Sequence, residues 1–252
     1  MSQLFTPYQI GQLTLPNRIV IAPMCQYSAI NGEATDWHLL HLGNLAISGA
    51  GLLIIEATAV EPEGRISPAD LGLWSDATEA ALDKVLKVVR RYSGMPIAIQ
   101  LGHAGRKAST AVPWEGGQLV SPEHGGWPVV APSALPYLPE DPVPIELDQA
   151  GLQRILAGFV SAAQRAYRLG IDAIEIHAAH GICYMSFYRR FQIADLIVMV
   201  VSWKIVCDFL WQCLMRCGRQ YLLKCPLVYG FLQPIGLMVV GIWNRVSYLQ
   251  KP

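Results

Sequence analysis

The chain has 252 residues, of which 52% are hydrophobic, and its formal net charge is zero. This length and apolar content supply enough core for one large α/β domain or two small ones. No run of Lys or Arg stands out, which excludes the electrostatic footprint of a nucleic-acid-binding protein. The first residues, MSQLFTPYQIGQLTLPNR, lack the basic start and the apolar core of a signal peptide, so we expect a cytoplasmic protein.

Four short apolar runs predict buried parallel strands. Each run ends in small or polar residues, and together they occupy residues 18–23, 51–60, 95–105 and 171–181. A first helix is expected over residues 36–51, where the pattern runs into a glycine. Asp76 and Glu79 predict a capping box ahead of a second helix over residues 80–91.

A third helix precedes the last strand, and Gly170 ends it. Its apolar residues fall on one face: Leu152, Ile155, Leu156, Phe159, Val160, Ala163 and Tyr167. Four strands alternating with three helices imply parallel βαβ units, arranged as a TIM barrel or a doubly wound sheet. No Gly-x-Gly-x-x-Gly motif follows the first strand. Its absence favours the α/β barrel over a dinucleotide-binding fold.

In a TIM barrel the chemistry lies at the carboxyl ends of the strands. At those positions this sequence has polar or reactive residues: Cys25, Tyr27, Glu56, Gln100, His103, His177 and His180. Residues 102–144 are rich in Gly and Pro, and we expect them to form an extended loop over the same face.

His177 and His180 follow the fourth strand and are the sharpest candidates. Two imidazoles at this spacing can donate hydrogen bonds to one oxyanion. One structural and one exposed histidine is an equally good interpretation. With His103 they would instead form the metal site of a barrel hydrolase. Because no His-x-His follows the first strand and no Asp or Glu stands on the loop side of the pair, we expect no metal.

Cys25 is the only cysteine before residue 182, and it follows Pro23 and Met24 at a strand end. A lone cysteine is usually inert packing, but this place also suits a redox or cofactor contact. Gln100 ends an apolar strand, so its buried amide needs a polar partner above the barrel. A planar heterocycle with several donors and acceptors would satisfy it.

Four stretches carry a specific resemblance, and they read PNRIVIAPMCQYS, DWHLLHLGNLAISGAGLLIIEATAVEPEGR, IAIQLGHAGRKAS and GIDAIEIHAAHG. In this order and spacing they resemble the old yellow enzyme family of FMN-dependent ene-reductases, in the subgroup with a cysteine in the loop after the first strand. The resemblance runs from about Leu4 to Gly181. It implies that residues 1–181 are the N-terminal part of an FMN-binding TIM barrel.

By this resemblance, six residues would line the isoalloxazine of FMN: Ala22, Pro23, Met24, Cys25, Ala57 and Gln100. Tyr27, His177 and His180 would hold the carbonyl oxygen of a small enone or another activated alkene. NADPH or NADH would reduce the flavin, whose N5 passes hydride to the β-carbon while the two catalytic histidines stabilise the enolate charge. A tyrosine after HAAHG protonates the α-carbon in this family, and this chain has Ile182 there. The resemblance also admits a homo-oligomer for the intact family member.

Residues 182–252 differ in composition from the rest of the chain. They hold 8 basic and 2 acidic residues, net +6, whereas residues 1–181 hold 11 and 17, net −6. Five of the six cysteines lie in this tail, which has no Glu and no His. Residues 225–243 are apolar, but their prolines, glycines and Gln233 make a poor membrane span, so we expect no membrane contact.

One lost nucleotide near Gly181 and Ile182 explains both the position and the composition of this break. In the restored frame, the codons of residues 182–188 permit Tyr-Leu-Leu-His-Glu-Phe-Leu. Those of residues 203–209 permit Leu-Glu-Asn-Arg-Met-Arg-Phe. Both strings resemble the family's continuation. We therefore predict that residues 182–252 are an aberrant, frame-shifted tail.

The resemblance implies an FMN-dependent NAD(P)H oxidoreductase that reduces the C=C bond of α,β-unsaturated carbonyl compounds. Half a barrel leaves open strand edges and an uncovered core. We therefore expect this chain to be poorly stable and to bind FMN weakly. The alternatives are a truncated or frame-shifted fragment without catalysis and, less favoured, a metal-dependent barrel hydrolase.

Overall fold

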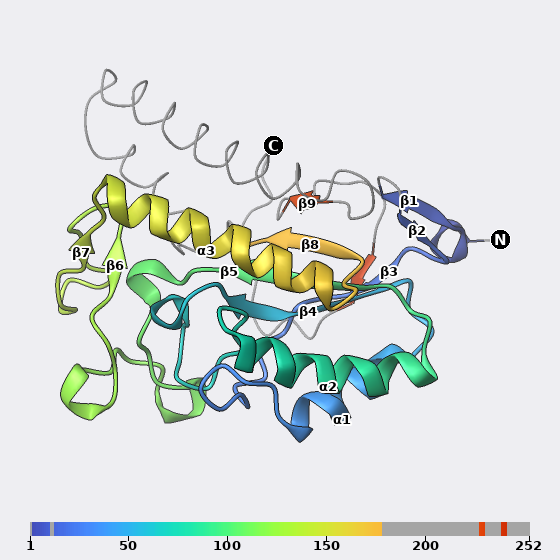
Figure 1. The fold of residues 1–252 in the computed structure, drawn as a ribbon, viewed down its shortest axis with the longest axis horizontal. Helices are drawn as coiled ribbons and strands as arrows, with labels where there is room; N and C mark the ends of the chain where they lie inside the picture. The colour runs from blue at the N-terminus through green and yellow to red at the C-terminus, as the bar shows by residue number, and fades with distance from the viewer. Residues whose placement is uncertain (1, 11–12, 178–226, 230–237, 241–252) are drawn as a thin grey trace, which may run out of the picture.

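A computed structural model describes residues 2–10, 13–177, 227–229 and 238–240 of the chain. Its centre is a parallel sheet of six strands in the order β10-β3-β4-β5-β8-β9 (Figure 1). The four predicted strands are present as neighbours: β3 (Ile19–Ile21), β4 (Leu52–Ala59), β5 (Ile97–Gly102) and β8 (Ala173–Ile176). The predicted α/β class with parallel strands is confirmed.

Two short strands from the tail extend this sheet. β9 (Leu227–Tyr229) pairs with β8, and β10 (Met238–Val240) pairs with β3. β3 and β8 thus each gain a three-residue partner, and the expected open strand edges lie at β9 and β10 instead. Within the described residues β9 and β10 pair with no further strand, so the sheet is open where a complete barrel closes.

Three helices cover one face of the sheet (Figure 1): α1 (Asp36–Ala46), α2 (Asp76–Tyr92) and α3 (Gln149–Arg168). Their apolar sides and the outward side chains of β4 and β5 form the main core, with Phe159 fully buried. The predicted face of α3 holds except at Tyr167, which is 47% exposed. The buried row continues at Ala166 instead, and Gly170 follows the helix at a φ of 69°, as predicted for its end.

A second apolar cluster joins the inner face of the sheet to Leu15; its members from the sheet are Val20, Leu52, Ile54, Ala98 and Ala173. The antiparallel hairpin of β1 (Tyr8–Ile10) and β2 (Leu13–Leu15) packs against it. Sequence reasoning did not predict this hairpin, because its strands are only three residues long. The hairpin corrects the expectation of an uncovered core, since these six residues are all buried.

The long Gly- and Pro-rich segment contains more regular structure than predicted. It forms three turns of 3₁₀-helix, at Gly105–Lys107, Pro113–Glu115 and Pro122–His124. It also supplies β6 (Val130–Ala131), which pairs with β7 (Ile145–Glu146). Among the helices of the described residues, none combines the length and apolar character needed to cross a bilayer.

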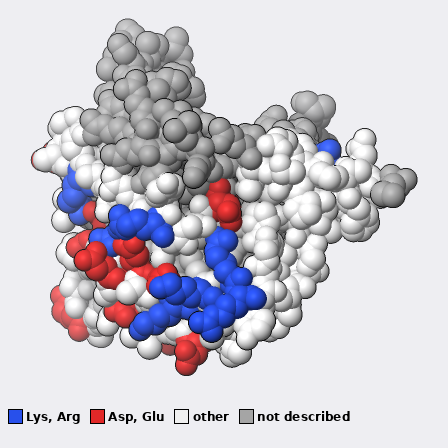
Figure 2. Space-filling view, turned by 45° about the vertical axis from the view of Figure 1, so that its right-hand side comes forward, with Lys and Arg blue, Asp and Glu red and all other residues white. Residues whose placement is uncertain are grey.

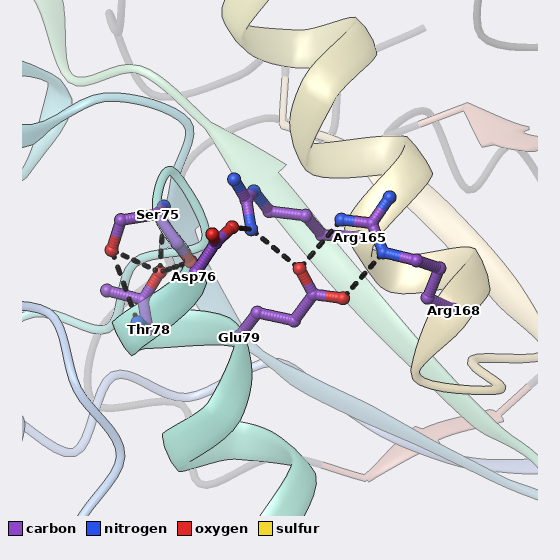
Figure 3. A network of polar contacts seen from close by, with 6 residues as sticks. All are labelled: Ser75, Asp76, Thr78, Glu79, Arg165 and Arg168. Carbon is purple, nitrogen blue, oxygen red and sulfur yellow. Dashed lines mark hydrogen bonds and ion pairs between the residues drawn. The ribbon is translucent and has the colours of Figure 1, made fainter.

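The start of α2 differs from the prediction. Ser75, one residue earlier than expected, is the N-cap, and its hydroxyl and that of Thr78 accept each other's backbone N–H groups. Glu79 is therefore not part of the cap. Its carboxylate instead accepts hydrogen bonds from Arg165 and Arg168 of α3 at 2.6–2.8 Å (Figure 3). These bonds hold the Glu79 pKa below its usual range.

Basic and acidic side chains lie beside one another on the same side of the described surface (Figure 2). Ion pairs of two kinds join such side chains in the described residues. Glu79 and Arg165 are mostly buried, at 17% and 13% side-chain exposure, whereas Asp83 and Lys87 form an exposed pair within α2. Only the first kind joins two helices, so we expect it to matter more for stability.

We predict that Glu79→Ala lowers the free energy of unfolding by about 2 kcal/mol, because it leaves two arginines without their shared carboxylate. The matched control Asp83→Ala removes the exposed carboxylate of the same helix and should cost less than about 0.5 kcal/mol. Urea denaturation measures both. Equal losses in the two variants would contradict the account of the α2–α3 contact.

Candidate functional site

The carboxyl ends of β4, β5 and β8 bring polar side chains to one edge of the sheet. Ala57 pairs with Gln100, and Gln100 pairs with Glu175. A small cavity of about 10 Å³ lies at this edge, and its lining includes Ala57, Gly102, Asp70 and His177. The sequence prediction that chemistry belongs at this edge thus coincides with a cavity.

Gln100 is buried, as predicted, but its amide has a partner within the protein. Its Nε2 donates to Oε1 of Glu175 at 2.9 Å. Burial raises the pKa of the Glu175 carboxyl, and the hydrogen bond from Gln100 partly offsets this. The expected polar partner of Gln100 is thus present within the protein, in Glu175. An amide has two N–H groups and one oxygen, so one donor to Glu175 does not use up its capacity.

Cys25 and Tyr27 lie on the loop that follows β3. Tyr27 has a φ of 49°, in the left-handed region, which costs a non-glycine residue about 1–3 kcal/mol. Burial raises the pKa of Tyr27 to about 12 and also raises that of the Cys25 thiol. Both side chains are therefore neutral hydrogen-bond donors at pH 7. The ring of Tyr27 meets Trp114 edge-on, at a centroid distance of 5.6 Å.

Glu56 is the extra residue of a β-bulge in β4, since Ile55 pairs with Ile99 and Ala57 already pairs with Gln100. Its carboxylate accepts the backbone N–H of Gln26 at 2.8 Å and lies 3.3 Å from Nε2 of His38. Sequence reasoning named Glu56 but missed His38. A histidine at the third position of a helix, where a capping glutamate is usual, was the available signal.

His103 lines the same cavity as His177, but its ring nitrogens are engaged within the protein. Its Nε2 lies 2.8 Å from Oε1 of Glu61, and its Nδ1 accepts the N–H of Gly105. Arg154 of α3 donates to the other oxygen of Glu61 at 2.8 Å. Both ring nitrogens are thus engaged, which removes His103 from a metal site. In the part of the chain that the structure describes, no three His, Cys, Asp or Glu side chains cluster as metal ligands.

The remaining predicted residues divide among three places. His177 lines the cavity and donates its backbone N–H to Leu101 at 2.8 Å. Ala22 and Met24 line a separate apolar groove of about 670 Å³ between β3 and α1. Pro23 lies between them on the chain and is partly buried. His180 and Ile182 lie outside the described residues.

Asp70 is a cavity residue that sequence reasoning missed, because it follows no predicted strand. Its carboxylate accepts the N–H groups of Ile66 and Ser67 and the hydroxyl of Ser67, at 2.7–3.2 Å. Burial nevertheless raises its pKa from 3.8 to about 6, and the charge of Glu56 adds to this. The hydrogen bonds favour the ionised form, but desolvation outweighs them.

We predict that Asp70 makes the chain less stable as the pH rises from about 4 to about 6. The unfolded chain loses the Asp70 proton near pH 3.8, whereas the folded chain holds it to about pH 6, so rising pH favours unfolding. The loss is at most about 3 kcal/mol.

Urea denaturation of the wild type and Asp70→Asn across this pH range isolates the contribution of Asp70 to the free energy of unfolding. The other carboxylates titrate in both chains, and the difference between the two curves should shrink or reverse as the pH rises. Curves that stay parallel would contradict the raised pKa.

A sequence pattern described as the NADH:flavin oxidoreductase / NADH oxidase family matches residues 3–192. The chain belongs to this family. An NADH:flavin oxidoreductase of Gibberella zeae is 46% identical over 190 residues, which are 74% of this chain and 46% of that protein. An NADPH dehydrogenase of Listeria monocytogenes is 44% identical over 189 residues, which are 74% of this chain and 51% of that protein.

Among solved structures, morphinone reductase in complex with tetrahydroNAD matches with a TM-score of 0.70 and 28% identity, over 95% of this chain and 67% of that one. These findings confirm the predicted membership of the old yellow enzyme family and the relation to its TIM-barrel fold. The chain spans about half the length of the curated relatives it matches. The family match ends at residue 192, shortly after the change in composition.

Proposed function

We propose that the described residues form the flavin side of an ene-reductase site, in which FMN and NAD(P)H serve the reduction of α,β-unsaturated carbonyl compounds. The observation that carries the proposal is the edge at which Ala57 and His177 line one cavity and Gln100 pairs with Ala57 on the neighbouring strand. Relatives described as NADH:flavin oxidoreductase and NADPH dehydrogenase support it.

The donor set at this edge fits a planar heterocycle. Ala57 and Gly102 are small, so few side-chain atoms stand beside the strand ends. Gln100 retains hydrogen-bonding capacity beyond Glu175, and Cys25 is an uncharged thiol. When bound, FMN supplies the hydride for the alkene. Tyr27 and His177 would orient the substrate's carbonyl oxygen, with Tyr27 keeping its phenol proton at neutral pH.

We also propose that this chain is an impaired member of its family. The composition changes at residue 182, where the family's tyrosine is replaced by Ile182, which has no proton to give. His180 and the junction at residues 181–182, where the frame shift is predicted, lie outside the described residues. A fragment without catalysis is the second candidate, and the break in composition favours it.

A bulky side chain at Ala57 tests the position of the flavin. We predict that Ala57→Leu weakens FMN binding by about tenfold or more, because the added atoms enter the cavity. Ala77→Leu makes the same change at an exposed position of α2 and should leave the affinity unchanged.

Quenching of FMN fluorescence during titration measures both variants against the wild type, at millimolar concentrations if binding is weak. An equal affinity of Ala57→Leu and wild type would place FMN elsewhere. No quenching by the wild-type chain would favour the fragment without catalysis.

A further inference from the structure

The loop after β3 is held at two points on either side of Tyr27. On one side the backbone N–H of Gln26 donates to Oε2 of Glu56 at 2.8 Å. On the other side the hydroxyl of Thr35 donates to the carbonyl oxygen of Ser28 at 2.9 Å. Tyr27, between the two anchors, has the left-handed backbone conformation that a non-glycine residue keeps only when its surroundings impose it.

The side chain of Gln26 adds a third restraint. Its Nε2 donates to the carbonyl oxygen of Met24 at 2.8 Å, and its Oε1 accepts the indole N–H of Trp37 at 3.1 Å. Gln26 is thus fixed through both its backbone and its side chain. Its chain neighbours are Cys25 and Tyr27, the two residues expected to face the flavin and the substrate. A shift of Gln26 would therefore displace both.

Glu56 reaches the loop because of the bulge. A bulge adds one residue to a strand and redirects its side chain, and bulges are frequent beside active sites. Glu56 stands between the buried Ile55 and the cavity residue Ala57 and is itself only 4% exposed. An ionisable side chain at such a position is costly unless it is paired. The partner within reach is the imidazole of His38.

His38 is oriented by the start of α1. Its Nδ1 accepts the backbone N–H of Thr35 at 3.0 Å, so the neutral ring carries its proton on Nε2. Nε2 lies 3.3 Å from Oε1 of Glu56, within ion-pair distance, and it has no hydrogen-bond partner among the described residues. His38 is 1% exposed, so water does not replace Glu56 as its partner. Thr35 therefore binds the loop directly through Ser28 and also orients the imidazole of His38 toward Glu56.

We propose that Glu56, backed by His38, is a positioning residue that holds Cys25 and Tyr27 in place for the bound flavin and its carbonyl substrate. The proposal rests on the proposed function and adds a residue to that same site. Glu56 acts through the N–H of Gln26 and touches neither flavin nor substrate. It stabilises the strained conformation of Tyr27 before any ligand binds, so that binding need not order the loop.

Hydrogen–deuterium exchange in the flavin-free chain tests the anchor itself. In Glu56→Ala we expect the amides of residues 24–28 to exchange about tenfold faster, because the N–H of Gln26 loses its acceptor. The amides of β5 should keep their wild-type rates. Glu56→Gln, which retains an oxygen at the same reach, should restore most of the protection.

Glu79→Ala is the matched control, since it removes a paired carboxylate at the α2–α3 contact. It should leave exchange at residues 24–28 unchanged. If Glu56→Ala does not fold, Glu56→Asp replaces it, because the shortened side chain keeps the charge but withdraws from Gln26. Wild-type exchange at residues 24–28 in Glu56→Ala, or in the Glu56→Asp that replaces it, would overturn the proposal. Equally fast exchange at these residues in Glu79→Ala would overturn it as well.

FMN titration of the same variants separates positioning from mere loop stability. We expect about tenfold weaker binding in Glu56→Ala, recovery in Glu56→Gln and no change in Glu79→Ala. A loosened loop with unchanged FMN affinity would overturn the proposal. A wild-type chain that binds no FMN contradicts the proposed function, while the flavin-free exchange still supports or overturns the anchor.

Discussion

Parallel strands place all their carboxyl ends at one edge of a sheet, and the rest of this site depends on that constraint. Gln100 meets Glu175 because β5 and β8 are in register, and Ala57 meets Gln100 because a bulge shifts β4 by one residue. Residues about 40 and 75 positions apart in the sequence thereby become neighbours. The edge gathers these groups whether or not a ligand is bound.

Buried carboxylates dominate the polar chemistry at this edge, and each is satisfied differently. Glu175 accepts from Gln100, Glu56 binds a loop amide beside His38, and Asp70 accepts three local hydrogen bonds. Because burial raises the pKa values of Asp70, Cys25 and Tyr27, the edge combines acidic groups with neutral donors. Such groups suit a ligand with an uncharged heterocycle and a carbonyl oxygen better than a ligand that carries a carboxylate.

The sequence predicts the strands and helices well, because their apolar periodicity is strong. It also predicts that the carboxyl ends of these strands meet at one edge. It fails where a single residue decides between two local arrangements: Ser75 rather than Asp76 caps α2, and His103 turns to Glu61. His38 and Asp70 were missed because their roles depend on tertiary contacts with Glu56 and the loop before it, which no local pattern encodes.

The central claim is that this chain carries the flavin side of an ene-reductase site but lacks what completes it. The most direct test compares flavin absorbance of the purified chain with that of a chain translated after one base is restored at the Gly181–Ile182 junction. The account predicts little FMN and no enone reduction for the first, and about one FMN per chain with activity for the second. Stoichiometric flavin and family-like enone reduction by the unrestored chain would contradict it.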